Sequence, residues 1–179
     1  MDVEDNSTGG GTASSLAGAM AAGLAGMVAR LSQGKKNLGP SEHFEELAVR
    51  AEKLCQELFQ GGARDSEAFA QVSKAFGLPK ETEGEKAARS RAIREGMVLC
   101  ARVPLQNASL CGQVLALCRE LEKSYNTNAS SDLECAGHLA RAGLRGCAAN
   151  VRVNLPYLKD EDLVRDLETR LDSILKDLT

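Results

Sequence analysis

Apolar residues recur every three or four positions along most of the chain, and no segment alternates apolar and polar residues as a half-buried strand does. This period predicts helical segments over about 12–31, 41–60, 65–76, 82–103, 106–123 and 131–154, and a last one from 160. The pattern therefore predicts an all-α fold, a single domain over residues 1–179 in which six or seven helices surround a buried helix rich in small residues. Residues 1–8 are expected to form a flexible N-terminal segment.

The first predicted helix carries no charge from Ala13 to Ala29 and consists largely of alanine and glycine. Gly18, Ala22 and Gly26 recur every four residues, so one face is flat enough for another helix to approach closely. The run is short of the roughly 20 strongly apolar residues that a membrane span requires. We therefore expect a buried core helix and no membrane association.

Three glycines, Gly9, Gly10 and Gly11, precede this helix. Glycine lets a backbone come close to a ligand, and the N–H groups of a helix start favour an anion. An anion-receiving loop and a flexible tail are both compatible with such a segment. The segment lacks the Gly-Lys-Ser/Thr ending of a P-loop, which excludes that kind of phosphate site.

Two signals predict interruptions in the helical pattern. The pair Gly61-Gly62 is expected to break one helix, and Pro104 is expected to kink or end the helix that a capping box of Thr82 and Glu85 opens. Asp65 follows the glycine pair. It suits the N-cap of the resumed helix, and in a partly dry pocket it suits a catalytic carboxylate with a raised pKa.

Composition narrows the classes of protein that fit. The net charge of −3 lacks the basic excess of a nucleic-acid binder, so no nucleic-acid partner is expected. The six cysteines form no Cys-x-x-Cys pair, and the two histidines are not spaced with them as metal ligands. We expect mostly buried free thiols, no bound metal and a cytoplasmic location.

Polar residues mark one face of the helix predicted over 131–154. Asp132, Asn150 and Asn154 share that face, with small residues between them. A buried amide costs stability unless its hydrogen bonds are satisfied. Asn154 could be a C-terminal cap but Asn150 could not, so a binding role and a structural role are equally open.

Several motifs follow one another in a fixed order along the chain. They are Gly9-Gly10-Gly11-Thr12-Ala13-Ser14, Met27-Val28-Ala29-Arg30-Leu31, Gly34-Lys35-Lys36, Asp65-x-x-Ala68-Phe69, Leu78-Pro79-Lys80, Arg89, Val103-Pro104-Leu105, Asn126-x-Asn128-x-x-Ser131-Asp132 and Asn150-Val151-x-Val153-Asn154-Leu155. In this order they resemble the cyclodeaminase/cyclohydrolase family, which includes the C-terminal domain of formiminotransferase-cyclodeaminase and stand-alone methenyltetrahydrofolate cyclohydrolases. The resemblance extends over nearly the whole chain.

The resemblance implies an all-α enzyme of folate one-carbon metabolism that acts as a homodimer or larger homo-oligomer. Its substrate would be 5-formiminotetrahydrofolate, which loses ammonia, or 5,10-methenyltetrahydrofolate, which is hydrolysed. No cofactor beyond this tetrahydrofolate derivative is implied, and a formiminotransferase is a possible partner. The family's catalytic aspartate falls on Asp65. The residues that would bind substrate are Gly9, Gly10, Gly11, Lys80, Arg89, Asn126, Ser131, Asp132, Asn150 and Asn154.

The chain also departs from the family pattern in three places. The segment before the glycines is short and polar, the last helical segment is curtailed after Thr179, and Gly61-Gly62 interrupts a stretch that is helical in the family. These departures keep an alternative open, in which the chain is a catalytically inactive folate-binding or assembly protein of the same fold.

Overall fold

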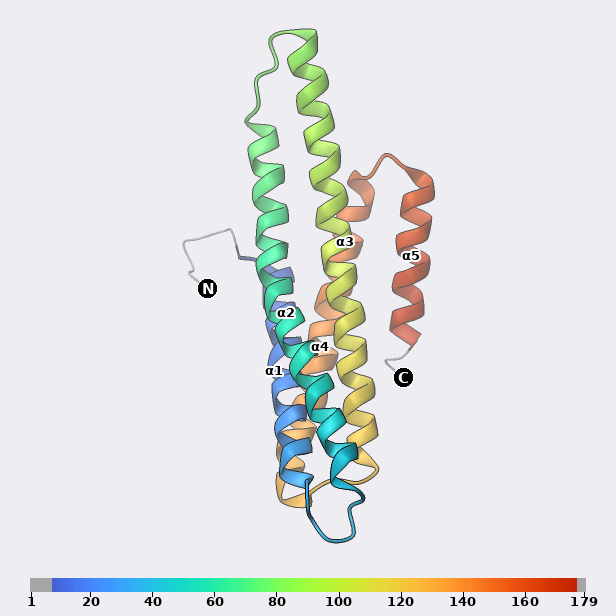
Figure 1. Ribbon diagram of the computed structural model, residues 1–179. Coiled ribbons are helices and arrows are strands. Elements are labelled where there is room, and N and C mark those ends of the chain that lie inside the picture. The colour runs from blue at the N-terminus through green and yellow to red at the C-terminus, as the bar shows by residue number, and fades with distance from the viewer. Residues whose placement is uncertain (1–7, 177–179) are drawn as a thin grey trace.

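Four long helices lie side by side along one axis in the computed structural model, which describes residues 8–176 (Figure 1). They are α1 (Gly10–Ser32), α2 (Ser41–Phe76), α3 (Glu83–Glu122) and α4 (Ser130–Asn154), and α5 (Glu161–Leu175) packs outside them against α3. Short 3-10 turns at Thr127–Ala129 and Leu155–Tyr157 flank α4, and no strand occurs within residues 8–176. The all-α class is confirmed, but this part of the chain has five α-helices. The segment predicted to be flexible lies, apart from Thr8, outside the described residues.

The break predicted at Gly61-Gly62 is wrong, because α2 continues through both glycines. A Cβ on Gly61 would overlap the Asn107 side-chain oxygen and lie 2.9 Å from Ser15 Oγ. A Cβ on Gly62 would lie 3.4 Å from Thr12 Cγ2. The glycines cost helix propensity, about 1 kcal/mol each, but they let α1 and α3 approach the backbone of α2.

The interruption predicted at Pro104 is also wrong, because α3 runs through this buried proline. A proline inside a helix has no N–H, so the carbonyl four residues earlier loses its usual donor. That carbonyl belongs to Cys100, and here it accepts a hydrogen bond of 2.9 Å from Asn154 Nδ2 on α4. A side chain from another helix thus replaces the missing backbone donor.

The small residues of α1 let it sit deep among the other helices. A Cβ on Gly18 would lie 2.6 Å from Cys111 Sγ on α3, and one on Gly26 would lie 3.1 Å from Ala51 Cβ on α2. By length and mean hydropathy α1 could also span a membrane, but 56% of that stretch is buried against the rest of the protein. Such burial is typical of a core helix, as the sequence pattern predicts.

The α2–α3 hairpin extends beyond its neighbours. These two helices have 36 and 40 residues, whereas α1 and α4 have 23 and 25. At about 1.5 Å per residue the difference is roughly 20 Å, and Figure 1 shows the hairpin projecting past the start of α1 and the end of α4. We call this projecting part, residues 69–99, the arm. The predicted capping box closes its tip: Thr82 Oγ1 accepts from Glu85 N over 3.2 Å, and Thr82 N donates to Glu85 Oε2 over 2.8 Å.

Candidate functional site

A cleft opens where the arm leaves the four-helix bundle. Its volume is about 270 Å³, and it lies between the first turn of α1, the middle of α2 and α3, and the end of α4. The residues that line it are Gly9, Gly10, Gly11, Asp65, Phe69, Cys100, Asn150, Val153 and Asn154. Six of the eleven candidate residues from the sequence are therefore gathered in one place.

Asp65 is the one ionisable carboxylate in the lining of this cleft. It lies inside α2 and not at a helix start, which excludes the N-cap interpretation. Thr12 Oγ1 donates to Asp65 Oδ2 over 3.3 Å. Burial raises the pKa of the Asp65 carboxyl group, and this effect exceeds the opposite effect of the hydrogen bonds from the Thr12 side chain and backbone. The Asp65 carboxyl group therefore keeps its proton to a higher pH than an exposed aspartate does.

The three glycines form the start of α1 and not a separate loop. Gly9 is the extended N-cap residue, and Gly10 and Gly11 belong to the first helical turn. A Cβ on Gly11 would lie only 2.6 Å from Asp65 Cγ. Because the first N–H groups of a helix lack intrahelical partners, this turn brings donors and the positive end of the helix dipole close to the carboxylate.

The two amides on α4 differ in their roles. Asn154 Nδ2 donates to the Cys100 carbonyl at 2.9 Å and to the Asn150 carbonyl at 2.8 Å, so it joins α4 to α3 and is not a simple helix cap. Asn150 Nδ2 donates to the Gly146 carbonyl over 2.9 Å, within its own helix. It would lie 3.5 Å from a Cβ on Gly10. Asn150 therefore lies next to the start of α1, and both line the cleft.

Asn126, Ser131 and Asp132 do not reach this cleft. Asn126 lies at the other end of α1, where its Nδ2 donates to the Leu31 carbonyl over 3.1 Å and its backbone N–H donates to Ser32 Oγ over 2.9 Å. Ser131 and Asp132 belong to the first turn of α4, whereas Asn150 and Asn154 belong to its last turns. Within one chain these three residues therefore lie at the far end of the bundle from the cleft.

Lys80 and Arg89 lie at the outer end of the arm. The Arg89 guanidinium donates to the Phe76 carbonyl at 3.3 and 3.4 Å and lies 5.7 Å from the centre of the Phe76 ring. Phe76 is 11 residues beyond Asp65 in α2, about 16 Å along the helix. Lys80 is exposed in the loop that follows. Neither cation lines the cleft.

Sequence reasoning assigned no role to four residues at the site: Thr12, Phe69, Cys100 and Val153. Phe69 is four residues after Asp65, so helical spacing could have placed both on one face. Cys100 is four residues before Pro104, so its carbonyl could have been recognised as lacking a donor. Its thiol is half-buried, and burial raises its pKa. No such local signal exists for Thr12, whose partners are 50 to 54 residues away.

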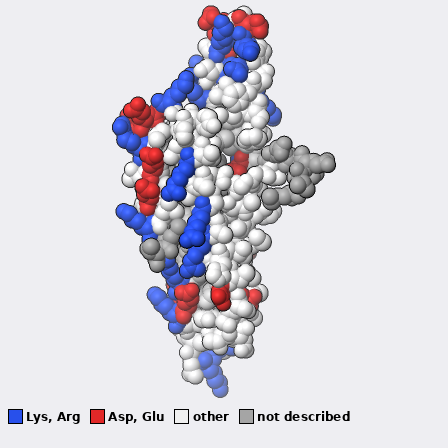
Figure 2. Space-filling view, turned by 180° about the vertical axis from the view of Figure 1, so that it is seen from behind, with Lys and Arg blue, Asp and Glu red and all other residues white. Residues whose placement is uncertain are grey.

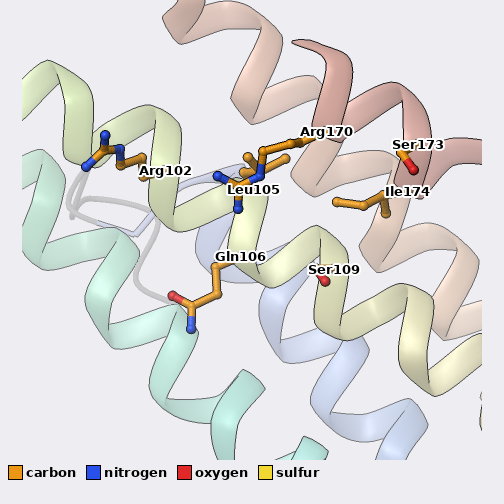
Figure 3. A pocket seen from close by; sticks show the side chains of 7 residues that line it. All are labelled: Arg102, Leu105, Gln106, Ser109, Arg170, Ser173 and Ile174. Atoms are coloured by element: carbon orange, nitrogen blue, oxygen red, sulfur yellow. The ribbon is translucent and has the colours of Figure 1, made fainter. Parts of the chain in front are cut away.

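The other candidate sites among the described residues have fewer features of a functional site than the cleft around Asp65. Within residues 8–176 no group of three His, Cys, Asp or Glu residues could hold a metal ion. All six cysteines are free, and three of them, Cys111, Cys118 and Cys147, are buried. A larger groove of about 590 Å³ lies between α3 and α5. Figure 3 shows that Arg102 and Gln106 point away from α5 there, so its polar groups do not converge on one point.

One side of the molecule exposes apolar side chains with few charges. Met20, Met27 and Leu31 occupy one stripe of α1 and are 56%, 38% and 46% exposed, while Val49 and Phe59 of α2 are 60% and 67% exposed. Figure 2, the view from behind, contains a broad area without Lys, Arg, Asp or Glu beside a row of basic side chains. We call the stripe Met20, Met27 and Leu31 the uncharged face of α1. Exposed apolar patches of this kind are typical of interaction surfaces.

Comparison with known proteins identifies relatives of this fold and site. Residues 2–173 match the family described as formiminotransferase-cyclodeaminase. The chain is 38% identical over 168 residues to a methenyltetrahydrofolate cyclohydrolase of Methylorubrum extorquens, covering 93% of this chain and 81% of that protein. It is 28% identical to the formimidoyltransferase-cyclodeaminase of Mus musculus, covering 94% of this chain but 31% of that longer protein. The crystal structure of a formiminotetrahydrofolate cyclodeaminase from Thermotoga maritima superposes with a TM-score of 0.86 at 27% identity, covering 98% of this chain and 84% of that one.

Proposed function

The chain belongs to the formiminotransferase-cyclodeaminase family, and on that premise we propose that it acts on a one-carbon derivative of tetrahydrofolate at the cleft around Asp65. The observation that carries this proposal is the placement of one partly buried carboxylate, with a raised pKa, against the first turn of α1. Both candidate reactions make or break a bond at an amidine-like carbon through a tetrahedral intermediate. Such chemistry needs positioning and proton transfer, and one carboxyl group can supply the latter.

For hydrolysis, the Asp65 carboxylate would take a proton from water as the water oxygen bonds to the methenyl carbon. The bond from that carbon to N5 of the pterin then breaks, and the Asp65 carboxyl group returns its proton to N5. The hydroxyl proton of the intermediate is released to solvent, which leaves 10-formyltetrahydrofolate. For ammonia loss, N10 bonds to the carbon of the protonated formimino group, and the Asp65 carboxylate would take the proton from N10 and pass it to the amino group. The bond from the carbon to that amino group then breaks and ammonia leaves, which gives 5,10-methenyltetrahydrofolate. Neither reaction requires a metal, a redox cofactor or a covalent nucleophile.

The surroundings of Asp65 suit a folate. The exposed ring of Phe69, one turn beyond Asp65, offers a surface for stacking a pterin. Asn150 offers an amide that can both donate and accept, as the edge of a pterin requires. A folate that extends from the cleft along the arm would bring its glutamate carboxylates toward Arg89 and Lys80. In this arrangement those two cations act on the tail and not on the reacting carbon.

Of the two reactions we favour hydrolysis of 5,10-methenyltetrahydrofolate. The support is the 38% identity to a methenyltetrahydrofolate cyclohydrolase across most of both chains, against 28% to a formimidoyltransferase-cyclodeaminase of which the chain spans about a third. The test is incubation of the purified protein with each substrate in turn, following the absorbance of the methenyl group. We expect that absorbance to fall with the methenyl substrate. A rise with 5-formiminotetrahydrofolate would assign ammonia loss instead, and no change with either would refute an enzymatic role.

One argument for the alternative, an inactive folate-binding or assembly protein, no longer holds. It rested in part on the break at Gly61-Gly62, and α2 has no break there. Thermal denaturation with and without folates separates the two ideas, since a ligand that binds the native state raises the Tm. A raised Tm without turnover would support folate binding alone. No shift with any folate would support an assembly role.

We also propose that the chain forms a homodimer or larger homo-oligomer, as the family resemblance implies, and that a second copy covers the uncharged face of α1. Met20 is the most exposed of the three residues of this face, at 56%, so a glutamate there would place a charge in the proposed contact. Light scattering after gel filtration should give a dimer or larger assembly for the unmodified protein and a smaller species for Met20→Glu. The control is Gln113→Glu, an equal change in charge at an exposed position on α3. A monomeric unmodified protein would refute this interface.

A further inference from the structure

Three polar side chains hold the turn of α2 that precedes Asp65. Ser15 Oγ donates to the Leu58 carbonyl over 2.5 Å. Asn107 Nδ2 donates to the Gly61 carbonyl over 3.2 Å, and Thr12 Oγ1 lies 3.3 Å from the Gly62 carbonyl. Two of these side chains come from α1 and one comes from α3, so the turn is held from both sides.

The bond from Asn107 bears most directly on Asp65. In an α-helix each carbonyl accepts from the N–H four residues later, so the Gly61 carbonyl is the acceptor for the backbone N–H of Asp65. Asn107 donates to this same oxygen from outside the helix. It therefore holds the backbone position from which the Asp65 side chain projects, without touching the cleft itself.

Stability does not explain an asparagine at position 107. The residue is 1% exposed, and its side-chain oxygen is buried without a hydrogen-bond partner. A buried acceptor without a donor costs free energy, and an apolar side chain such as leucine, with the same branching, would avoid that cost. Gly61 must also lack a side chain, because its Cβ would overlap the same oxygen. At this contact Asn107 and Gly61 are therefore both less favourable for the stability of the fold than other residues would be.

We infer that Asn107 is a positioning residue, which fixes the α2 backbone so that the Asp65 carboxylate meets the first turn of α1. The inference rests on the proposed function for its catalytic consequence. It does not rest on that function for its structural part, which is that Asn107 restrains the Asp65 backbone. The two parts can be measured separately.

The test is Asn107→Leu, which removes the donor and keeps the number and branching of the side-chain heavy atoms. A displacement of about 1 Å in a reacting group can cost up to about 100-fold in rate, so we expect kcat to fall by roughly 10- to 100-fold. KM should change by less than about threefold, because no group that touches substrate is altered. The Tm should not fall, since the unpaired oxygen is removed as well. A purely structural asparagine would give the opposite result, a lower Tm with an unchanged kcat.

A second pair of variants guards against a general loss of packing. Asn107→Ala leaves space, and Gly61→Ala on that background fills part of it. The double variant should recover Tm but not kcat, because the donor is still missing. The control is Leu117→Ala, a fully buried position lower on α3, which should lower Tm and leave kcat unchanged well below the melting transition.

Hydrogen exchange supplies a readout that does not depend on turnover. In Asn107→Leu the amide of Asp65 should exchange faster by about tenfold or more, while amides at the far end of α2 keep their rates. If the unmodified protein converts neither folate, the proposed function fails and exchange alone decides the positioning role. Unchanged exchange at Asp65, or a kcat within about twofold of the unmodified enzyme's, would overturn the inference.

Discussion

Gly11→Ala isolates the contact between α1 and Asp65 with a single methyl group. The added Cβ would lie 2.6 Å from Asp65 Cγ, whereas carbon atoms in contact prefer about 3.5–4.0 Å, so the carboxyl group must retreat by about 1 Å. Such a displacement can cost about 100-fold in rate. Stability changes little, because alanine gains about 0.5–1 kcal/mol of helix propensity over glycine and this offsets the weakened bond from Thr12.

The assay compares kcat and Tm of Gly11→Ala with those of a matched variant, Gly84→Ala. Gly84, like Gly11, is the second residue of a helix, but nothing lies within 4 Å of its Cβ position. We expect Gly84→Ala to keep full activity with an equal or higher Tm, and Gly11→Ala to lose about 100-fold in kcat at a similar Tm. Full turnover by Gly11→Ala would show that the position of the Asp65 carboxylate does not limit the reaction.

Three further changes test other parts of the structure. Asp65→Asn should lower kcat by about 10²–10⁴-fold. Because the folded pKa of Asp65 is raised, the unmodified protein should lose stability relative to this variant as pH rises from about 3.9 through the folded pKa, and a constant Tm difference over that window would contradict the burial argument. Gly10→Val, which places branched carbons beside Asn150, should reduce folate turnover more than Tm; an equal loss of both would point to a folding defect. Thr82→Ala should lower the free energy of unfolding by about 1 kcal/mol in urea titrations and leave kcat unchanged, because it removes the cap at the tip of the arm.

Sequence rules succeeded where both partners of an interaction are close in the chain. The capping box of Thr82 and Glu85 is confirmed, since it involves residues three positions apart. The rules failed at Gly61-Gly62 and Pro104, where the compensating contacts come from other helices. A propensity scale has no access to those contacts, so it predicted interruptions in two helices that are continuous.

The candidate site was predicted in part, for a similar reason. Asp65, the glycines and the amides at the end of α4 meet because the first turn of α1 and the last turns of α4 lie at the same end of the bundle. Asn126 and Asp132 precede those amides by about the length of α4. They therefore lie at the opposite end of the bundle. The order of motifs in a sequence does not say which end of a bundle each one occupies. Thr12 and Asn107 were missed because only the folded packing gives them partners.

Because α2 and α3 are longer than α1 and α4, we expect the arm and the four-helix bundle to unfold with different cooperativity. In the four-helix bundle α1 packs against α2, α3 and α4, and the other long helices each pack against at least two neighbours. Within the arm α2 and α3 have chiefly each other, around small contacts such as Val72, Ala75 and Gly96. Amides of the arm should therefore exchange through local opening, at free energies below that of global unfolding, while amides of α1 should exchange only when the whole bundle unfolds. Asp65 lies at the boundary between these two regimes. Local opening of the arm would therefore leave the hydrogen bond between Asp65 and Thr12 of α1 in place.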